Sequence, residues 1–366
     1  MSNFFATLIM LFTSLFGGET GGSQPPENGS GDDVVVEDGN TQDGGATDPA
    51  PESGDDSGES GILPGYDQLV FNDEFDGSDL DRNLWCTRYV YGGGPSLQIP
   101  DDSCQPVTGA GTLDFLNDER QRYVDYNRSG ESMHVVNEGA LKLRATATRT
   151  NDSYAGYESA MIRSKANFKP DSSNSYFIVA RVKLPNVVGT WPAFWINSDL
   201  DANGNGAWPP EIDIFEGALN GVEDTATMLH QAGIVKGQQT ASGSTEITYQ
   251  SDDFDATWKN YHSDSGSLRN RWLEVGIEWK AESVCYYVNG DKTMCENYRW
   301  VSNQGSSTPN AHILVNLAIG GQWAGRYGVG EEFLEHYSAQ QVAEKGLSTS
   351  FPTEMAIDYI RVYKNN

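Results

Sequence analysis

From residue 62 onward, the chain consists of short segments in which apolar and polar residues alternate, separated by Gly, Asn, Asp and Ser. A period of two places every second side chain on one face of an extended strand, and turn residues between such runs favour antiparallel pairing. Only residues 339–345 are typical of a helix. The pattern therefore predicts an all-β protein, an antiparallel β-sandwich. The clearest predicted strands are 140–146, 176–184, 272–279, 284–288, 312–319 and 355–363.

The N-terminus begins with an apolar run, FFATLIMLFTSLF, at residues 4–16. These thirteen residues are too few to cross a bilayer comfortably, and their length suits the apolar region of a secretory signal. No Lys or Arg precedes the run and no Ala-x-Ala follows it, so a misassigned start codon or a buried helix is the alternative. We expect residues 1–17 to be a signal peptide.

Residues 18–61 differ from the rest of the chain in composition. They are rich in Gly, Ser, Asp, Glu and Pro, and residues 1–61 together carry 12 acidic and no basic side chains. Such a segment cannot bury enough apolar surface to offset the entropy lost on ordering. We expect 18–61 to be an acidic disordered linker and 62–366 to form one folded domain.

The charge of the chain excludes one class of partner. The sequence has 52 acidic and 24 basic residues, which gives a formal net charge of −28. Binding to nucleic acid requires a basic surface that neutralises phosphates. We therefore expect no nucleic-acid partner.

The four cysteines form two pairs that are close in sequence, Cys86 with Cys104 and Cys285 with Cys295. Four cysteines allow three disulfide connectivities. The local pairing is favoured because Cys285 and Cys295 flank a hairpin signal, Asn-Gly-Asp at 289–291. Disulfides agree with an exported protein, and four reduced buried thiols are the alternative.

One ten-residue segment, WPPEIDIFEG, carries three carboxylates. On a regular strand Glu211 and Asp213 would face one side and Glu216 the other. A β-bulge at Ile214 or Phe215 restores Glu216 to the same side, and bulges are common beside active sites. We therefore expect the three carboxylates to share one face.

The spacing of the two glutamates suits a particular reaction. With the bulge they are about four strand steps apart, or ~13 Å between Cα atoms, and their side chains can approach to about 5–5.5 Å. That gap is the one used for retaining glycoside hydrolysis, with one carboxylate as nucleophile and the other as acid. Three clustered carboxylates cannot all ionise at low cost, so at least one pKa should rise. A solvated strand face is the alternative reading of the same pattern.

Two tryptophans precede this segment by about one strand, Trp191 and Trp195 in GTWPAFW. Exposed aromatic rings stack on the apolar faces of sugars, which makes both candidates for substrate binding. Ordinary packing in the core is the alternative for each of them.

These segments together resemble the glycoside hydrolases of family 16. The resemblance rests first on EIDIFE at 211–216, preceded by GTWPAFW at 189–195. It covers residues 66–364, and the remaining matching segments occur in the family's order. They are LVFNDEFDGSDLDRNLW (69–85), NDERQRYVD (117–125), HILVNLAIGGQWAG (312–325) and FPTEMAIDYIRVYK (351–364).

The resemblance implies a curved, concanavalin-like β-jelly roll with an open substrate cleft. It also implies endo-acting, retaining hydrolysis of β-glucans or β-galactans by a catalytic domain at 62–366. By position, Glu211 is the expected nucleophile, Asp213 the assisting carboxylate and Glu216 the general acid/base. No cofactor is expected for catalysis.

Other positions are assigned by the same resemblance. Trp191 and Trp195 match residues that line the sugar nearest the cleaved bond. Glu119, His230 and Trp323 match further residues of the cleft, with an ordinary core or turn role as the alternative for His230.

The family often carries a structural calcium ion on the convex side. Glu74, the carbonyl group of Gly139 and Asp358 match that site in this sequence. Surface acids without a metal are the alternative.

The substrate class remains open between two groups. The E-x-D-x-x-E spacing resembles laminarinase-type members, and agar, porphyran and carrageenan hydrolases share it. The acidic domain favours a neutral polysaccharide, so we expect β-1,3- or mixed β-1,3/1,4-glucan. A β-galactan hydrolase, a transglycosylase and a non-catalytic glycan-binding protein are the alternatives. We expect a monomer that is secreted, periplasmic or on the cell surface, without membrane contact once the signal is removed.

Overall fold

The computed structural model describes residues 63–89, 118–148, 156–198, 210–221, 225–236, 254–301 and 309–365. The predicted signal peptide and linker, at 1–61, lie outside these residues and stay predictions. Within the described residues, no helix is long and apolar enough to cross a membrane.

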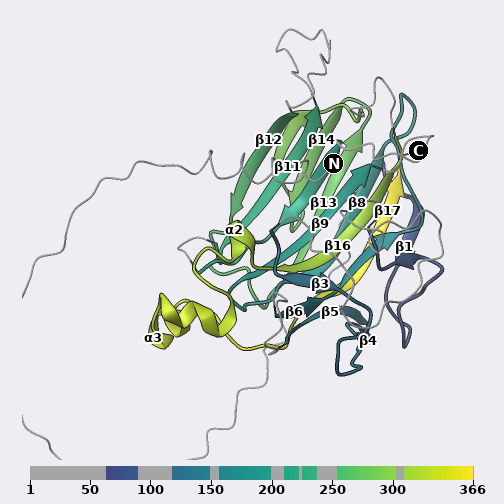
Figure 1. Cartoon of the computed structure of the whole chain (residues 1–366). Coiled ribbons are helices and arrows are strands. Elements are labelled where there is room, and N and C mark those ends of the chain that lie inside the picture. The colour runs from purple at the N-terminus through teal and green to yellow at the C-terminus, as the bar shows by residue number, and fades with distance from the viewer. Residues whose placement is uncertain are drawn as a thin grey trace, which may run out of the picture. The chain divides into compact units, whose positions relative to one another are not determined.

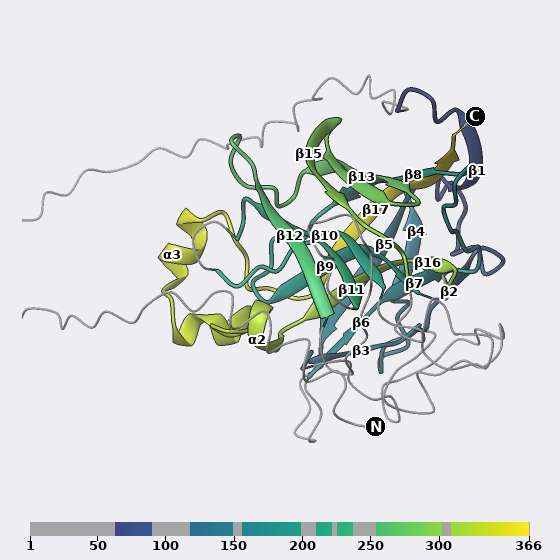
Figure 2. The same ribbon diagram turned by 90° about the horizontal axis from the view of Figure 1, so that it is seen from above.

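Two sheets face each other as a β-sandwich (Figure 1). Seen from above, β8, β13 and β17 lie in one layer and β9, β12 and β16 in the other (Figure 2). The larger sheet consists of β1 (Gln68–Asp73), β3 (Gln121–Tyr123), β4 (His134–Asn137), β5 (Ala140–Ala147), β6 (Tyr157–Ser159), β8 (Tyr176–Lys183), β13 (Trp272–Lys280), β14 (Ser283–Val288), β15 (Asp291–Asn297) and β17 (Thr353–Lys364). The smaller sheet consists of β2 (Trp85–Cys86), β7 (Met161–Ser164), β9 (Thr190–Ser198), β10 (Glu211–Glu216), β11 (Met228–Lys236), β12 (Phe254–His262) and β16 (Ala311–Ile319).

The order of the smaller sheet positions the acidic segment. Its strands run β12-β11-β10-β9-β16-β7-β2, so β10 lies near the middle of the sheet between β9 and β11. All pairings in this sheet are antiparallel, as expected from the alternating pattern. The six strands expected from alternation are confirmed as β5, β8, β13, β14, β16 and β17, with bounds that differ by at most two residues.

Helical structure is confined to short segments in the described residues. The predicted helix is α3 (Ala339–Glu344), which begins at a capping box formed by Ser338 and Gln341. The structure adds α2 (Gly321–Ala324) and a 3₁₀ turn, η1 (Gly330–Glu335), which alternation in the sequence did not indicate.

The hairpin joining β14 and β15 confirms the second disulfide. Asn289 and Gly290 both have positive φ, 50° and 82°. A two-residue hairpin turn whose twist matches that of the strands requires positive φ at both positions. Cys285 and Cys295 are directly opposite each other in this hairpin and are bonded. Cys86 is also disulfide-bonded, and its expected partner, Cys104, lies outside the described residues.

The core between the sheets contains large aromatic side chains, of which Trp279 on β13 is a clear example. It is fully buried and packs edge-to-face on Trp300, with 5.0 Å between ring centroids. We expect Trp279→Ala to lower the free energy of unfolding by about 3–5 kcal/mol, because the cavity cannot collapse fully. Urea denaturation measures this loss. Trp272 on the same strand is 37% exposed, and Trp272→Ala, as the matched control, should cost less than about 1 kcal/mol.

Candidate active site

The bulge expected in β10 is present. Along β9, the pair Asp213–Trp195 is followed directly by Phe215–Phe194, which leaves Ile214 as an extra residue. Along β11, Asp213 pairs with Ala232 and Glu216 pairs with His230. Ile214 and Phe215 together therefore oppose one residue of β11. The strand therefore changes parity between Asp213 and Glu216, as the spacing of the acids required.

The side chains of β10 divide according to this bulge. Ile212, Ile214 and Phe215 are fully buried in the core between the sheets. Glu211 and Asp213 are only 8% and 4% exposed, and they alternate with Ile212, so they point to the opposite face of the strand. Burial, and then the charges of Glu211 and Glu216, raise the pKa of Asp213, as expected for carboxylates that share one face of the strand.

Burial and mutual repulsion set the ionisation of this cluster. Burial first, and then the charge of Glu211, raise the pKa of Glu216 to about 8. Burial likewise raises the pKa of Asp213 well above its ordinary value. Glu216 is therefore protonated at neutral pH, the state that a general acid needs.

Three of the predicted aromatic and histidine side chains gather beside Glu216. The Trp191 indole Nε1 donates a hydrogen bond to Glu216 Oε1 at 3.1 Å. The ring of Trp323 packs edge-to-face on Trp191, with centroids 5.0 Å apart, and on His230, with centroids 5.5 Å apart. His230 is fully buried, and burial lowers its pKa, so the imidazole is neutral. A hydrogen bond between His230 Nδ1 and Asn260 Oδ1, 2.9 Å long, fixes its ring.

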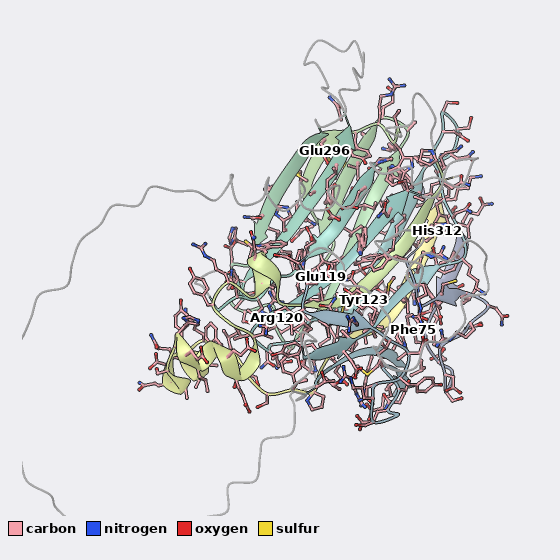
Figure 3. All side chains as sticks on the ribbon, viewed as in Figure 1. Phe75, Glu119, Arg120, Tyr123, Glu296 and His312 are labelled. Carbon is pink, nitrogen blue, oxygen red and sulfur yellow. A yellow bond between two sulfur atoms is a disulfide. The ribbon has the colours of Figure 1, made fainter. Side chains whose placement is uncertain are left out.

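The other two predicted residues, Trp195 and Glu119, are joined by a chain of hydrogen bonds. Trp195 Nε1 donates to Asn316 Oδ1 at 2.8 Å, and Asn316 Nδ2 donates to the Tyr123 hydroxyl at 3.0 Å. That hydroxyl donates to Glu119 Oε2 at 3.2 Å. Glu119 also raises the pKa of Glu216 through its charge, so the chain ends beside the carboxylate cluster. Figure 3 labels Glu119 and Tyr123 near β3.

Three residues of this site were not anticipated from the sequence: Tyr89, Tyr123 and Asn316. Tyr89 packs against Trp195 with 5.8 Å between ring centroids, and the charges of Glu119 and Glu211 contribute to its raised pKa. Tyr123 could have been found, because Tyr123 and Glu119 lie four residues apart in a segment of alternating parity. Nothing local in the sequence marks Tyr89 or Asn316.

The residues expected to hold calcium have other partners. Arg361 binds both oxygens of Glu74, from Nε at 2.9 Å and from Nη2 at 2.7 Å. Arg181 Nη1 donates to Asp358 Oδ2 at 2.7 Å. Arginine side chains thus neutralise both carboxylates in this structure. The calcium site stays a prediction, and no step below depends on it.

The arrangement defines a class of protein. Glu211, Asp213 and Glu216 share one face of a strand, and Trp191 contacts Glu216. Paired carboxylates are the catalytic groups of glycoside hydrolases. Residues 110–293, half of the chain, match the family described as "XgeA-like, catalytic GH16 domain". The chain belongs to glycoside hydrolase family 16.

Individual proteins agree with this assignment. The chain is 26% identical over 317 residues to "Glucan endo-1,3-beta-glucosidase A1" of Niallia circulans, a match that covers 81% of this chain and 38% of that protein. It is 26% identical over 300 residues to the "Beta-glucanase" of Rhodothermus marinus, covering 77% and 84% of the two chains. The fold matches the laminarinase catalytic domain of Thermotoga maritima with a TM-score of 0.55 and 24% identity, covering 82% of this chain and 98% of that one.

Proposed function

We propose that this protein is a retaining endo-β-glycanase that cuts internal bonds of β-1,3- or mixed β-1,3/1,4-glucan. The observation that carries the proposal is the bulge in β10, which brings Glu216, protonated at neutral pH, to the face of Glu211. The names of the relatives from Niallia circulans and Rhodothermus marinus support a glucan as substrate.

The first chemical step forms a covalent intermediate. A carboxylate oxygen of Glu211 attacks the anomeric carbon, while the Glu216 carboxyl gives its proton to the glycosidic oxygen. The bond between that oxygen and the anomeric carbon breaks, and the leaving sugar departs with a hydroxyl group. The separation of about 5–5.5 Å between the carboxyl groups, which retention requires, stays a prediction.

The second step returns the enzyme to its starting state. Glu216, now ionised, removes a proton from water as the water attacks the anomeric carbon. The ester bond to Glu211 breaks, and the released sugar has the configuration of the substrate. Asp213 lies between the two glutamates along the strand. Burial and the charges of both glutamates raise its pKa, so its carboxyl group can hold a proton beside them.

The tryptophans provide the contacts for the sugar. Partly buried Trp191 and Trp195 present aromatic surface on the strand that pairs with β10. Trp191 has a second role, because its indole fixes the Glu216 carboxyl. We assign Trp323 and Glu119 to the same binding surface through their contacts with Trp191 and the hydrogen-bond chain to Trp195.

Product analysis tests the proposed function. Purified protein is incubated separately with laminarin, lichenan, agarose, porphyran and κ-carrageenan, and oligosaccharides are separated by mass. Release from laminarin or lichenan is expected. Release from a galactan alone would show that the substrate is a β-galactan. Products longer than the oligosaccharide supplied as substrate would show transglycosylation. No product from any of the five, with folded protein, contradicts the proposal.

The rate of hydrolysis should depend on pH through Glu216. Its carboxyl is neutral and able to donate below its pKa of about 8, and it loses that proton as the pH rises through this value. We expect kcat/KM for the polysaccharide to fall on the alkaline side near pH 8, as a property of the coupled cluster. Measured from pH 5 to 10, this fall should be missing from the residual activity of Glu216→Gln. A fall that persists in that variant would assign it to another group.

We further propose that the chain is exported and acts as a monomer outside the cytoplasm. Disulfide bonds persist in oxidising compartments, and Cys285–Cys295 is formed here. The apolar run at 4–16 supplies a candidate signal.

A further inference from the structure

The bulge that brings Glu216 to the catalytic face creates a problem for the backbone. An extra residue in a strand leaves its peptide groups without partners in the ladder. A buried carbonyl group without a hydrogen bond costs about 1–3 kcal/mol. Ile214, the extra residue, is fully buried in a strand with neighbours on both sides, so its carbonyl needs a partner from elsewhere.

A side chain from the neighbouring strand supplies that partner. Gln231 is the single residue of β11 that opposes Ile214 and Phe215. Its amide Nε2 donates to the carbonyl oxygen of Ile214 at 3.2 Å, and it is fully buried. A carbonyl oxygen only accepts, so this contact requires the nitrogen end of the amide.

The other end of the same amide is held from the opposite sheet. The Thr293 hydroxyl on β15 donates to Gln231 Oε1 at 2.6 Å. The two strands also approach each other nearby, since a Cβ atom at Gly233 would lie 2.5 Å from Glu296 Oε1. Figure 3 labels Glu296 at that end of the sandwich. Gln231 is therefore tied to both layers of the fold.

Packing alone does not account for a glutamine at this position. Its neighbours along β10, Ile214 and Phe215, belong to an apolar core. A buried amide is unfavourable there unless its hydrogen bonds are made, whereas Leu or Met would fill similar space without that requirement. The amide meets its requirement with Ile214 on one side and Thr293 on the other.

We propose that Gln231, oriented by Thr293, is the positioning residue that fixes the β10 bulge and thereby aims Glu216 at the glycosidic oxygen. Gln231 does not touch the substrate; it acts through the backbone of Ile214. The inference rests on the role proposed above for Glu216 as general acid.

The test compares substrates that differ in their need for an acid. Gln231→Met keeps length and volume but removes the donor. We expect its kcat/KM for the polysaccharide to fall about 10²-fold, the lower range for loss of a general acid. For a 2,4-dinitrophenyl β-glycoside of the same sugar, whose leaving group needs no proton, we expect less than about a threefold loss. Equal losses on both substrates, or no loss on either, would overturn the proposal.

Two controls separate this inference from the proposed function. Glu216→Ala must itself lose activity selectively on the polysaccharide; if it does not, the role of Glu216 is wrong. If it does and Gln231→Met does not, only the role of Gln231 is wrong. Thr293→Val should repeat the selective loss in weaker form, and Thr293→Ser, which keeps the hydroxyl, should restore activity to within about twofold. This Thr293 pair decides the question if Gln231→Met does not fold.

Discussion

Replacing Glu211 with glutamine is expected to lower kcat on the polysaccharide by at least about 10⁴-fold, because an amide cannot form the covalent intermediate. The substitution keeps shape and removes one charge from a cluster in which charges repel. The fold should therefore persist, and affinity for the polysaccharide should remain. Rates of reducing-sugar release, circular dichroism and affinity electrophoresis measure these three properties.

A surface carboxylate outside the proposed site serves as the control. Glu138 has a side chain that is 80% exposed and pairs with Lys142 on the surface. Glu138→Gln should retain full activity within error. If Glu211→Gln kept more than a tenth of the activity, the nucleophile would have to be another residue. If it lost both activity and binding, the change would have disturbed the site as a whole.

Replacing Glu216 with alanine is expected to lower kcat/KM on the polysaccharide by about 10²–10⁴-fold, the range for removal of a general acid. The second step then lacks its base, so the covalent intermediate should accumulate with an activated aryl glycoside. Azide needs no base and should release that intermediate. We expect azide to accelerate turnover of this variant and to leave the wild-type rate unchanged.

The stereochemistry of the azide product assigns the two glutamates independently. In Glu216→Ala, azide displaces Glu211 and gives the β-glycosyl azide. In Glu211→Ala, azide attacks the substrate directly and gives the α-glycosyl azide. Proton NMR distinguishes the two products. The opposite assignment of anomers would exchange the roles of nucleophile and acid.

Much of the fold could be predicted from local patterns. Alternation over about eight residues predicted β5, β8, β13 and β16. In β5 and β13 one face is buried more than the other, whereas all residues of β16 are buried. The hairpin between β14 and β15 was predicted because Asn289 and Gly290 tolerate positive φ. The bulge was predicted from a conflict of parity between Glu211 and Glu216, which only an extra residue resolves.

The supporting residues of the site could not be predicted in this way. Asn316 reaches Tyr123 across 193 positions of the sequence, and Gln231 reaches Thr293 across 62. Their roles depend on which strands become neighbours and which face across the sandwich, and no local pattern encodes that. Trp191 was predicted to contact sugar, but its hydrogen bond to Glu216 depends on the pairing of β9 with β10.

The crowding of acids on β10 has a consequence for the range of conditions that the enzyme tolerates. Folding raises the pKa of Asp213 and Glu216 above their values in the unfolded chain, so the native state holds more protons. Stability from this source is complete below the unfolded pKa values and is lost as the pH rises through the folded ones. As the pH rises to about 8, Glu216 thus loses the proton that catalysis needs, and the protein loses the stability that these two groups contribute. An environment of mild acidity serves both needs, and a descendant that gave up catalysis could replace these acids and gain resistance to base.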